Sequence, residues 1–157
     1  AAQTNKAKSC DTQPTNAMKV ALDNGAYEPT RAHADDAGLD LRTPVAVTVP
    51  AGGSVAINTG VHIELPPGYY GHLQSKSGLN VNHNIVSLGG TIDTSYRGAI
   101  VAKLYNLGDT DYTFRAGDKI VQLVVQPFLA PPITVVPDVS ALSDTDRGAD
   151  GFGSSGR

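Results

Sequence analysis

Residues 45–74 read VAVTVPAGGSVAINTGVHIELPPGYYGHLQ, and this stretch decides the class of fold. Apolar residues alternate with polar or small ones, which is the period of a strand with one buried face. Proline and glycine residues interrupt the alternation and favour turns. The stretch therefore predicts four short strands, at residues 45–49, 54–58, 61–64 and 69–74.

The same pattern continues towards the C-terminus. Further strands are predicted over residues 100–105, 112–115 and 119–125, and prolines punctuate the sequence beyond them. No segment sustains a 3.6-residue period, and the best candidate helix is a short one near residues 80–84. Regular short strands with frequent turns predict an all-β sandwich or barrel.

Composition and charge limit the kinds of partner. The 157 residues fit one domain, and their formal net charge of −3 includes no basic run, which argues against a nucleic-acid polymer. No apolar run reaches the roughly 18 residues of a membrane span. Cys10 is the only cysteine in the sequence, so we expect a reducing compartment: the cytoplasm, or the nucleus in a eukaryotic cell. Residues 1–17 are polar and unpatterned, and we expect a flexible extension or a cloning remnant ahead of Met18.

Two segments place charged groups at the ends of predicted strands. AGLDL at residues 37–41 sets Asp40 between two apolar residues, and SKSGL at 75–79 joins a cation, a hydroxyl and a glycine. Glycine lets backbone N–H groups converge on one anion, so the second segment can wrap a phosphate. The alternatives are a turn carboxylate that caps local amides and a solvated turn.

A third segment, GGTIDTSYRG at residues 89–98, combines two glycines with an acid and an aromatic. The glycines allow another molecule to approach the backbone closely. Asp93 and Tyr96 could then hold a water molecule and a flat or sugar-like face. The alternative is a hairpin with a satisfied aspartate and a core tyrosine.

Two more segments carry polar groups in unusual places. AGDKIVQ at 116–122 puts Gln122 inside an apolar run, where its amide needs either a ligand or a hydrogen bond at a sheet edge. RGADGFGSSG at 147–156 offers a cation, backbone amides, hydroxyls and one aromatic, which suits a triphosphate under a base-stacking lid. A plain Gly/Ser tail is the alternative. The P-loop pattern is absent, because the segment lacks its lysine.

Together and in this order, the five segments resemble the five motifs of the trimeric dUTPase family. The resemblance spans essentially Met18 to Gly156. It implies a distorted β jelly-roll barrel that forms homotrimers, with three active sites each built from all three subunits. It also implies a barrel domain over residues 18–146 and a flexible, phosphate-binding lid arm over residues 147–157.

The resemblance implies a role for each matched residue in the hydrolysis of dUTP to dUMP and diphosphate. Asp93 would be the general base for the attacking water, Tyr96 would pack against deoxyribose, and Asp40 would contact Mg²⁺ through bound waters. The residues that would contact uracil are Gly89, Gly90, Thr91, Ile92 and Phe152. Those that would hold the phosphates are Lys76, Ser77, Gly78, Gln122, Arg147, Gly153, Ser154 and Ser155. Such an enzyme would keep uracil out of DNA and supply dUMP for thymidylate synthesis.

The sequence departs from the family pattern at two positions. Lys76 in the second motif and Lys119 in the fourth stand where the family usually has arginine. Lysine keeps the positive charge but lacks the planar fork that grips two phosphate oxygens at once. The departure therefore concerns affinity and rate more than the type of reaction.

Three other functions compete with this hypothesis. A regulatory binding protein of the same fold would take a protein partner, through residues 1–17 for example, and would release no diphosphate from dUTP. A dCTP deaminase shares the fold but needs its own catalytic glutamate and lacks the Gly-Phe-Gly-Ser tail. A structural jelly roll would not need Asp93 and Arg147 in these contexts.

Overall fold

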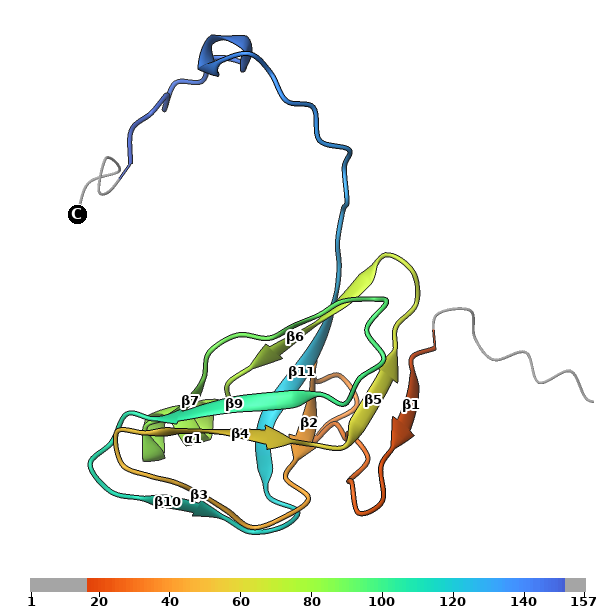
Figure 1. Cartoon of the computed structure of the whole chain (residues 1–157), viewed down its shortest axis with the longest axis vertical. Helices are drawn as coiled ribbons and strands as arrows, with labels where there is room; N and C mark the ends of the chain where they lie inside the picture. The colour runs from red at the N-terminus through yellow and green to blue at the C-terminus, as the bar shows by residue number, and fades with distance from the viewer. Residues whose placement is uncertain (1–16, 152–157) are drawn as a thin grey trace, which may run out of the picture.

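The structure, a computed structural model, describes residues 17–151 (Figure 1). Within this range almost all of the regular secondary structure is β-strand, and every strand pairing is antiparallel. The strands are β1 Lys19–Leu22, β2 Gly38–Arg42, β3 Val47–Val49, β4 Ser54–Asn58, β5 Val61–Glu64, β6 Tyr69–Gln74, β7 Ile85–Ser87, β8 Thr91–Ile92, β9 Val101–Asn106, β10 Tyr112–Phe114 and β11 Lys119–Pro127. The helical elements are α1 Ser77–His83 and the 3₁₀ turn η1 Val139–Ala141.

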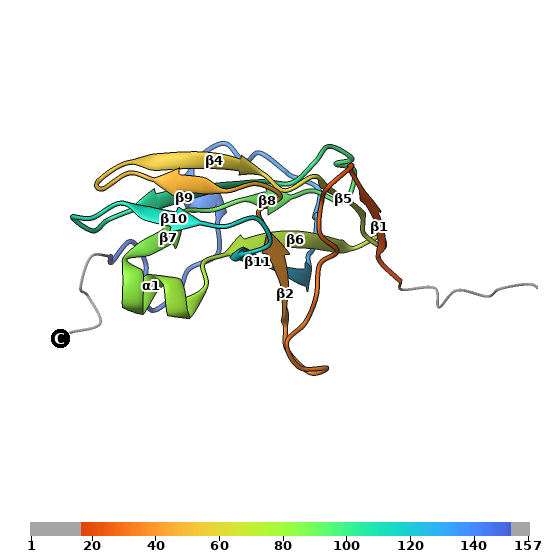
Figure 2. The same ribbon diagram turned by 90° about the horizontal axis from the view of Figure 1, so that it is seen from below.

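The strands form two layers. One contains the sheet β2-β11-β6-β8, the other the sheet β4-β9-β7, and the pairs β1-β5 and β3-β10 complete the barrel. The strands β4 and β9 cross β11 in Figure 1, and they lie at a different level from β6 and β11 in Figure 2. The hydrophobic core is enclosed between these layers.

Alternation along the strands separates the core face from the polar face of the larger sheet. Leu39, Leu123 and Leu73 stand side by side on β2, β11 and β6, and all three side chains are buried. Side chains one residue away point to the opposite face, because successive residues of a strand alternate. Asp40 and Gln122 therefore share that second face, paired across β2 and β11.

The clearest strand predictions are confirmed to the residue, at β4, β5 and β6. The first predicted strand begins two residues late, at Val47, because Thr43 Oγ1 donates a hydrogen bond to the carbonyl oxygen of Val45 and holds a local turn. The last runs two residues longer than predicted, to Pro127. Proline is tolerated there because the strand ends and needs no further N–H donor.

The short helix is confirmed but begins earlier than predicted, at Ser77. It ends at His83 and is capped by Asn84, whose φ of 55° is left-handed and whose N–H donates to the carbonyl oxygens of Leu79 and Asn80. Asparagine tolerates this conformation better than most residues. Within residues 17–151, no helix is long and apolar enough to cross a membrane.

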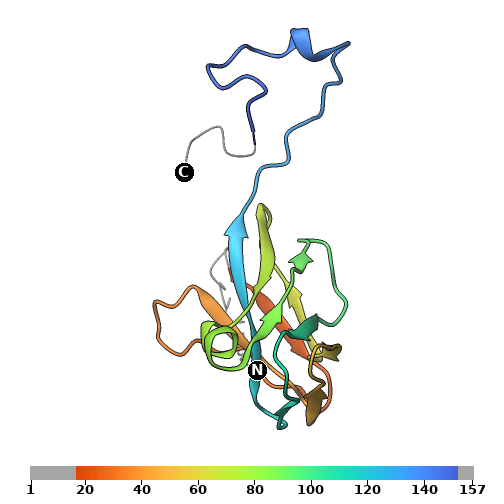
Figure 3. The same cartoon turned by 90° about the vertical axis from the view of Figure 1, so that its left-hand side faces the viewer.

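Residues 128–151 leave the barrel after β11 and run away from it, as Figures 1 and 3 both show. Almost every residue of this segment is exposed, including Leu129 and Ile133 at 93% and 92%. The segment therefore adds nothing to the core of its own barrel.

Candidate active site

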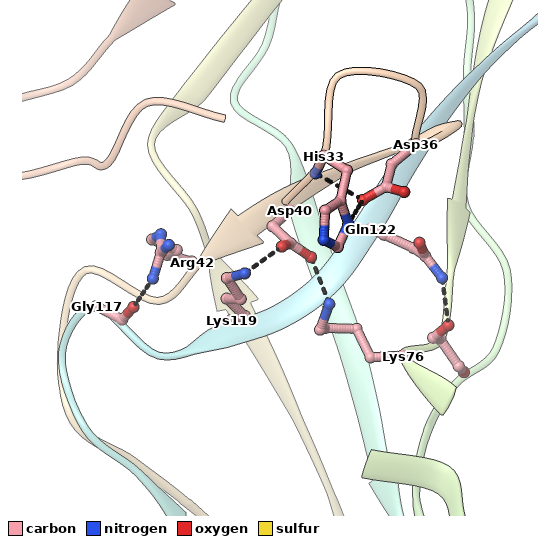
Figure 4. A network of polar contacts seen from close by, with 9 residues as sticks. His33, Asp36, Asp40, Arg42, Lys76, Gly117, Lys119 and Gln122 are labelled. Atoms are coloured by element: carbon pink, nitrogen blue, oxygen red, sulfur yellow. Dashed lines mark hydrogen bonds and ion pairs between the residues drawn. The ribbon is translucent and has the colours of Figure 1, made fainter. Parts of the chain in front are cut away.

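A buried carboxylate with two lysines forms one half of the candidate site. Asp40 is 5% exposed. Its Oδ2 lies 2.6 Å from the Nζ of Lys119, and its Oδ1 accepts a hydrogen bond from the Nζ of Lys76. Figure 4 shows the two lysines approaching Asp40 from two sides. Burial raises the pKa of Asp40, but the hydrogen bonds and charges of Lys119 and Lys76 outweigh it and hold that pKa below its ordinary value.

The strand register explains how these groups meet. Asp40 lies on the face opposite Leu39 and Leu41, which anchor β2 in the core. Lys119 begins β11, the strand beside β2, and Lys76 follows the end of β6 on the other side of β11. The alternative of a turn carboxylate that caps local amides is therefore wrong, because Asp40 is inside a strand and bonds to side chains.

Gln122 lies beside this cluster, on a central strand. Its Nε2 donates to the carbonyl oxygen of Ser75 at 3.0 Å, so the amide orders the backbone just before Lys76. A Cβ added at Gly38 would lie 2.2 Å from Gln122 Oε1, so glycine is what leaves room for this amide. The alternative is therefore met in part: the amide makes a hydrogen bond within the protein, although β11 lies inside the sheet between β2 and β6.

The cluster fits an outer-sphere contact to Mg²⁺. An ionised carboxylate has about four acceptor positions, of which the two lysines use two, so water bound to a metal could still donate to Asp40. Mg²⁺ usually keeps several waters and takes other ligands from substrate phosphates. Among the described residues no group of three or more histidine, cysteine, aspartate or glutamate side chains could bind a metal directly.

The second half of the site contains Asp93, which follows β8. Its side chain is exposed and lines an open pocket of about 410 Å³ with Tyr70, Thr91 and Phe128. The buried Ile92 next to it fills the core and anchors the strand end. A carboxylate held in this way can meet a water molecule and a substrate from solvent.

The glycine pair ahead of Asp93 is not the loop of a hairpin. The strand before it, β7, pairs with β9, whereas β8 pairs with β6, so the glycine pair joins two sheets and the alternative of a hairpin is wrong. Gly90 has a φ of 129°, and its carbonyl oxygen accepts from the N–H of Leu73 at 2.9 Å. A Cβ at Gly90 would lie 2.9 Å from Leu73 Cδ1. Close backbone packing and a positive φ both require glycine here.

Tyr96 is 44% exposed, so the alternative of a core tyrosine is wrong. Its hydroxyl donates to the carbonyl oxygen of Ala99 at 3.0 Å, which folds the ring back over Gly98. A Cβ at Gly98 would lie 2.3 Å from the hydroxyl oxygen and 2.5 Å from Cζ. Glycine at 98 therefore sets where the exposed ring face lies, on the same turn as Asp93.

The two halves lie apart within one chain. Gln122, beside Asp40, pairs with Gln74 at one end of β6, whereas Ile92 pairs with Gly71 nearer the other end. Asp93 therefore lies level with about residue 70, four residues from Gln74. At a strand rise of about 3.3 Å per residue, the level of Asp93 is roughly 13 Å from that of Gln122 and Asp40, measured along the strand direction. One barrel does not bring the lysine pair to the carboxylate of Asp93.

The arm carries one described site residue, Arg147. It is exposed, and its Nε donates to the carbonyl oxygen of Asp150 at 2.8 Å. Arg147 belongs to the segment that leads away from the barrel (Figure 3). The predicted residues Phe152, Gly153, Ser154 and Ser155 lie outside the described residues.

Two further predicted residues lie beside the lysine cluster in sequence. Ser77 and Gly78 begin α1 and are exposed, directly after Lys76. Sequence inspection missed three supports of the Asp93 turn, which are Thr94, Arg97 and His62. Thr94 and Arg97 lie within the third segment, but nothing in the sequence signals that His62 reaches it.

The fold and the site together define a class: a β-barrel protein with a cationic cluster and an exposed carboxylate, groups suited to hydrolysis of a phosphoanhydride. The sequence model of the dUTPase family matches residues 25–156. A deoxyuridine 5'-triphosphate nucleotidohydrolase of Paramecium bursaria Chlorella virus 1 is 41% identical over 135 residues, covering 86% of this chain and 94% of the relative. A probable one from Schizosaccharomyces pombe is 38% identical with the same coverage. The chain belongs to the dUTPase family.

Solved structures agree with the fold. The dUTPase of Staphylococcus bacteriophage 80alpha with dUpNHpp superposes with a TM-score of 0.79 at 30% identity, covering 90% of this chain and 99% of that one. A mutant dUTPase of phage phi11 of S. aureus, described for its coordination of a structural Mg(II) ion, gives a TM-score of 0.73 at 27% identity, covering 80% and 99%. The expected dUTPase-like β-barrel is thereby confirmed.

Proposed function

We propose that this chain hydrolyses dUTP to dUMP and diphosphate, with Asp93 as the general base for water attack on the α-phosphorus. The observation that carries the proposal is the placement of Asp93. It is an exposed carboxylate directly after β8 and the buried Ile92, beside an open pocket and on the same turn as Tyr96. One well-placed carboxylate contributes about 10²–10⁴-fold to such a proton transfer.

The phosphates would bind at the lysine cluster. Asp40 keeps Lys76 and Lys119 together, and their two ammonium groups can neutralise phosphate oxygens as charge develops. Backbone N–H groups of Ser77 and Gly78 would add to them, in a segment that Gln122 orders. When bound, Mg²⁺ would supply further neutralisation of the triphosphate.

Substrate selection would lie on the Asp93 side. The backbone of residues 89–92 would contact the uracil edge. A donor there would form a hydrogen bond with the carbonyl group of uracil, whereas the amino group of cytosine, itself a donor, could not accept it. Leaving such buried groups unpaired costs roughly 1–3 kcal/mol each. The exposed face of Tyr96 would lie against deoxyribose, where a 2′-hydroxyl would clash.

The complete site would require a homotrimer. Within one chain roughly 13 Å separates the two half-sites along the sheet. The arm leads away from its own barrel and carries exposed apolar residues, including Leu129, Ile133 and Val135. We propose that a barrel of residues 18–146 supplies both half-sites to different active sites, while residues 147–157 close over a third subunit's substrate. In a cell the enzyme would act in the cytoplasm, limiting dUTP and supplying dUMP.

A turnover assay tests the proposal directly. Diphosphate release from dUTP should be fast with Mg²⁺, and slower by orders of magnitude with dCTP, dTTP or UTP at equal concentration. A protein that binds dUTP but releases no diphosphate would instead be a regulatory binder of the same fold. Comparable rates with all four nucleotides would remove the proposed selectivity.

A further inference from the structure

The turn that carries Asp93 and Tyr96 is held by its carbonyl oxygens. The N–H of Tyr96 donates to the carbonyl of Asp93 at 3.0 Å. One guanidinium nitrogen of Arg97 donates to the carbonyls of Thr94, at 2.7 Å, and Tyr96, at 2.9 Å. The hydroxyl of Thr94 ties the start of the turn to the carbonyl of Tyr69 on β6. The position of Tyr96 thus depends on how the far end of the turn, at Arg97, is held.

His62 on β5 holds that far end. Its Nδ1 lies 2.8 Å from the carbonyl oxygen of Arg97, and its Nε2 lies 3.1 Å from Oδ1 of Asp23. A carbonyl and a carboxylate oxygen only accept hydrogen bonds, so both ring nitrogens must donate. A histidine with two N–H groups is an imidazolium, so this geometry requires the charged form of His62.

The surroundings of the ring favour its charged form. Asp23 faces it from the loop after β1, and Glu64 lies two residues along its own strand. Two cations lie nearby, Lys19 on β1 and Arg97. Both form ion pairs with Glu64, Lys19 at 2.7 Å and Arg97 at 3.9 Å. The hydrogen bond to the Arg97 carbonyl, and then that to Asp23, raise the pKa of His62 above its ordinary value.

We propose that His62, oriented by Asp23, is a positioning residue for the turn from Asp93 to Gly98, and that it makes the selectivity for dUTP over UTP depend on pH. The proposal rests on the proposed function. The charged ring holds the Arg97 carbonyl, and this keeps Tyr96 against the position of the sugar. Neutral imidazole has one N–H and cannot serve both acceptors.

The direction of the effect follows from the raised pKa. Below that pKa both bonds exist and selectivity is complete. As pH rises through it, the ring loses one proton, the Arg97 carbonyl competes with Asp23 for the remaining N–H, and the turn loosens. The measured quantity is the ratio of kcat/KM for dUTP to that for UTP. Ionisation of the triphosphate and of uracil cancels in this ratio, because both nucleotides carry the same groups.

The experiment measures this ratio between about pH 6 and 9 in the full chain, across the range where histidine titrates. In the wild type the ratio of kcat/KM for dUTP to that for UTP should fall about fivefold as pH rises across this range, the equivalent of one neutral hydrogen bond. His62→Leu should show the low ratio at every pH. His62→Arg is a permanent cation with several donors. Its ratio should be higher than that of His62→Leu and should not change with pH. His83→Gln, an exposed histidine on α1, serves as the matched control and should keep the wild-type profile.

Asp23→Asn separates positioning from a merely structural role. It leaves the ring in place but removes the charge that favours protonation, so the step in the ratio should move to lower pH. An NMR titration of the His62 ring should give a midpoint above the ordinary histidine value in the wild type and a lower one in Asp23→Asn.

The outcomes distinguish the two proposals. If the wild type hydrolyses dUTP but its ratio does not change with pH, or if His62→Leu matches the wild type, the role of His62 is refuted and the proposed function stands. If the wild type does not hydrolyse dUTP, the proposed function fails and takes this inference with it. The NMR midpoint then still reports whether the ring holds two protons.

Discussion

Two adjacent glycines offer a matched test of how the Asp93 segment is built. Gly89 and Gly90 both have positive φ, 83° and 129°. A Cβ at Gly89 would have no neighbour within 4 Å, whereas one at Gly90 would meet three atoms of Leu73 at 2.9 to 3.2 Å. Replacing each with alanine therefore imposes backbone strain at both positions but a steric clash only at Gly90.

The magnitudes follow from these contacts. An L-residue at positive φ costs about 1–3 kcal/mol, so Gly89→Ala should lower the free energy of unfolding by roughly that amount. Gly90→Ala adds an overpacking cost of about 1–3 kcal/mol. Leu73 is 2% exposed, so its side chain cannot relieve the clash by moving into solvent. The total for Gly90→Ala is about 2–6 kcal/mol. The entropy that alanine removes from the unfolded chain is common to both variants and cancels in their difference.

Urea unfolding measures this difference. The chain has no tryptophan and 6 tyrosines, so far-UV circular dichroism and tyrosine fluorescence are the suitable signals. Both variants should be compared at one protein concentration, because stability of an oligomer depends on it. Gly90→Ala should be less stable than Gly89→Ala by about 1–3 kcal/mol with a similar m-value. Equal destabilisation of the two variants would refute the argument that contact with Leu73 requires glycine at 90.

Four further predictions concern the site and its assembly. Asp93→Asn should keep dUTP binding within a few-fold but lower kcat by about 10²-fold or more, and near-normal turnover would remove Asp93 from the role of base. The pKa of Asp40 is lowered in the folded protein. Its contribution to stability is therefore present above the pKa of about 3.9 that it has in the unfolded chain, and is lost as pH falls through its pKa in the folded protein. The free energy of unfolding should accordingly fall less with decreasing pH in Asp40→Asn than in the wild type. An identical pH profile in the two proteins would contradict the ion-pair assignment. Light scattering should give a trimer that loses activity when it dissociates, and an active monomer would disprove the shared site. Truncation after Asp146 should leave a folded protein that binds dUMP but hydrolyses dUTP far more slowly, whereas full activity would exclude the lid.

The local sequence pattern predicted the strands well where apolar and polar residues alternate regularly between turn residues. The strands at 54–58, 61–64 and 69–74 are such cases, because proline or glycine lies just before or after each run and one face of each is apolar. The boundary at Val47 escaped prediction because it depends on the Thr43 side chain turning back on the backbone. Strand partners also escaped prediction. The segment around Gly89 and Gly90 looks like a hairpin locally, yet its two strands belong to different sheets.

The sequence alone determined the kinds of chemical group this protein carries, in an order specific enough to indicate its family. Asp93, Tyr96 and Lys76 could be named in this way, because glycines and charged residues at strand ends leave a local signature. Only the tertiary structure decided which groups meet. Lys76 and Lys119 reach Asp40 because β11 lies between β2 and β6, and His62 reaches Arg97 because the segment before β9 runs beside β5. Such contacts join residues far apart in the chain, and they depend on strand order and register, which residue pattern does not encode.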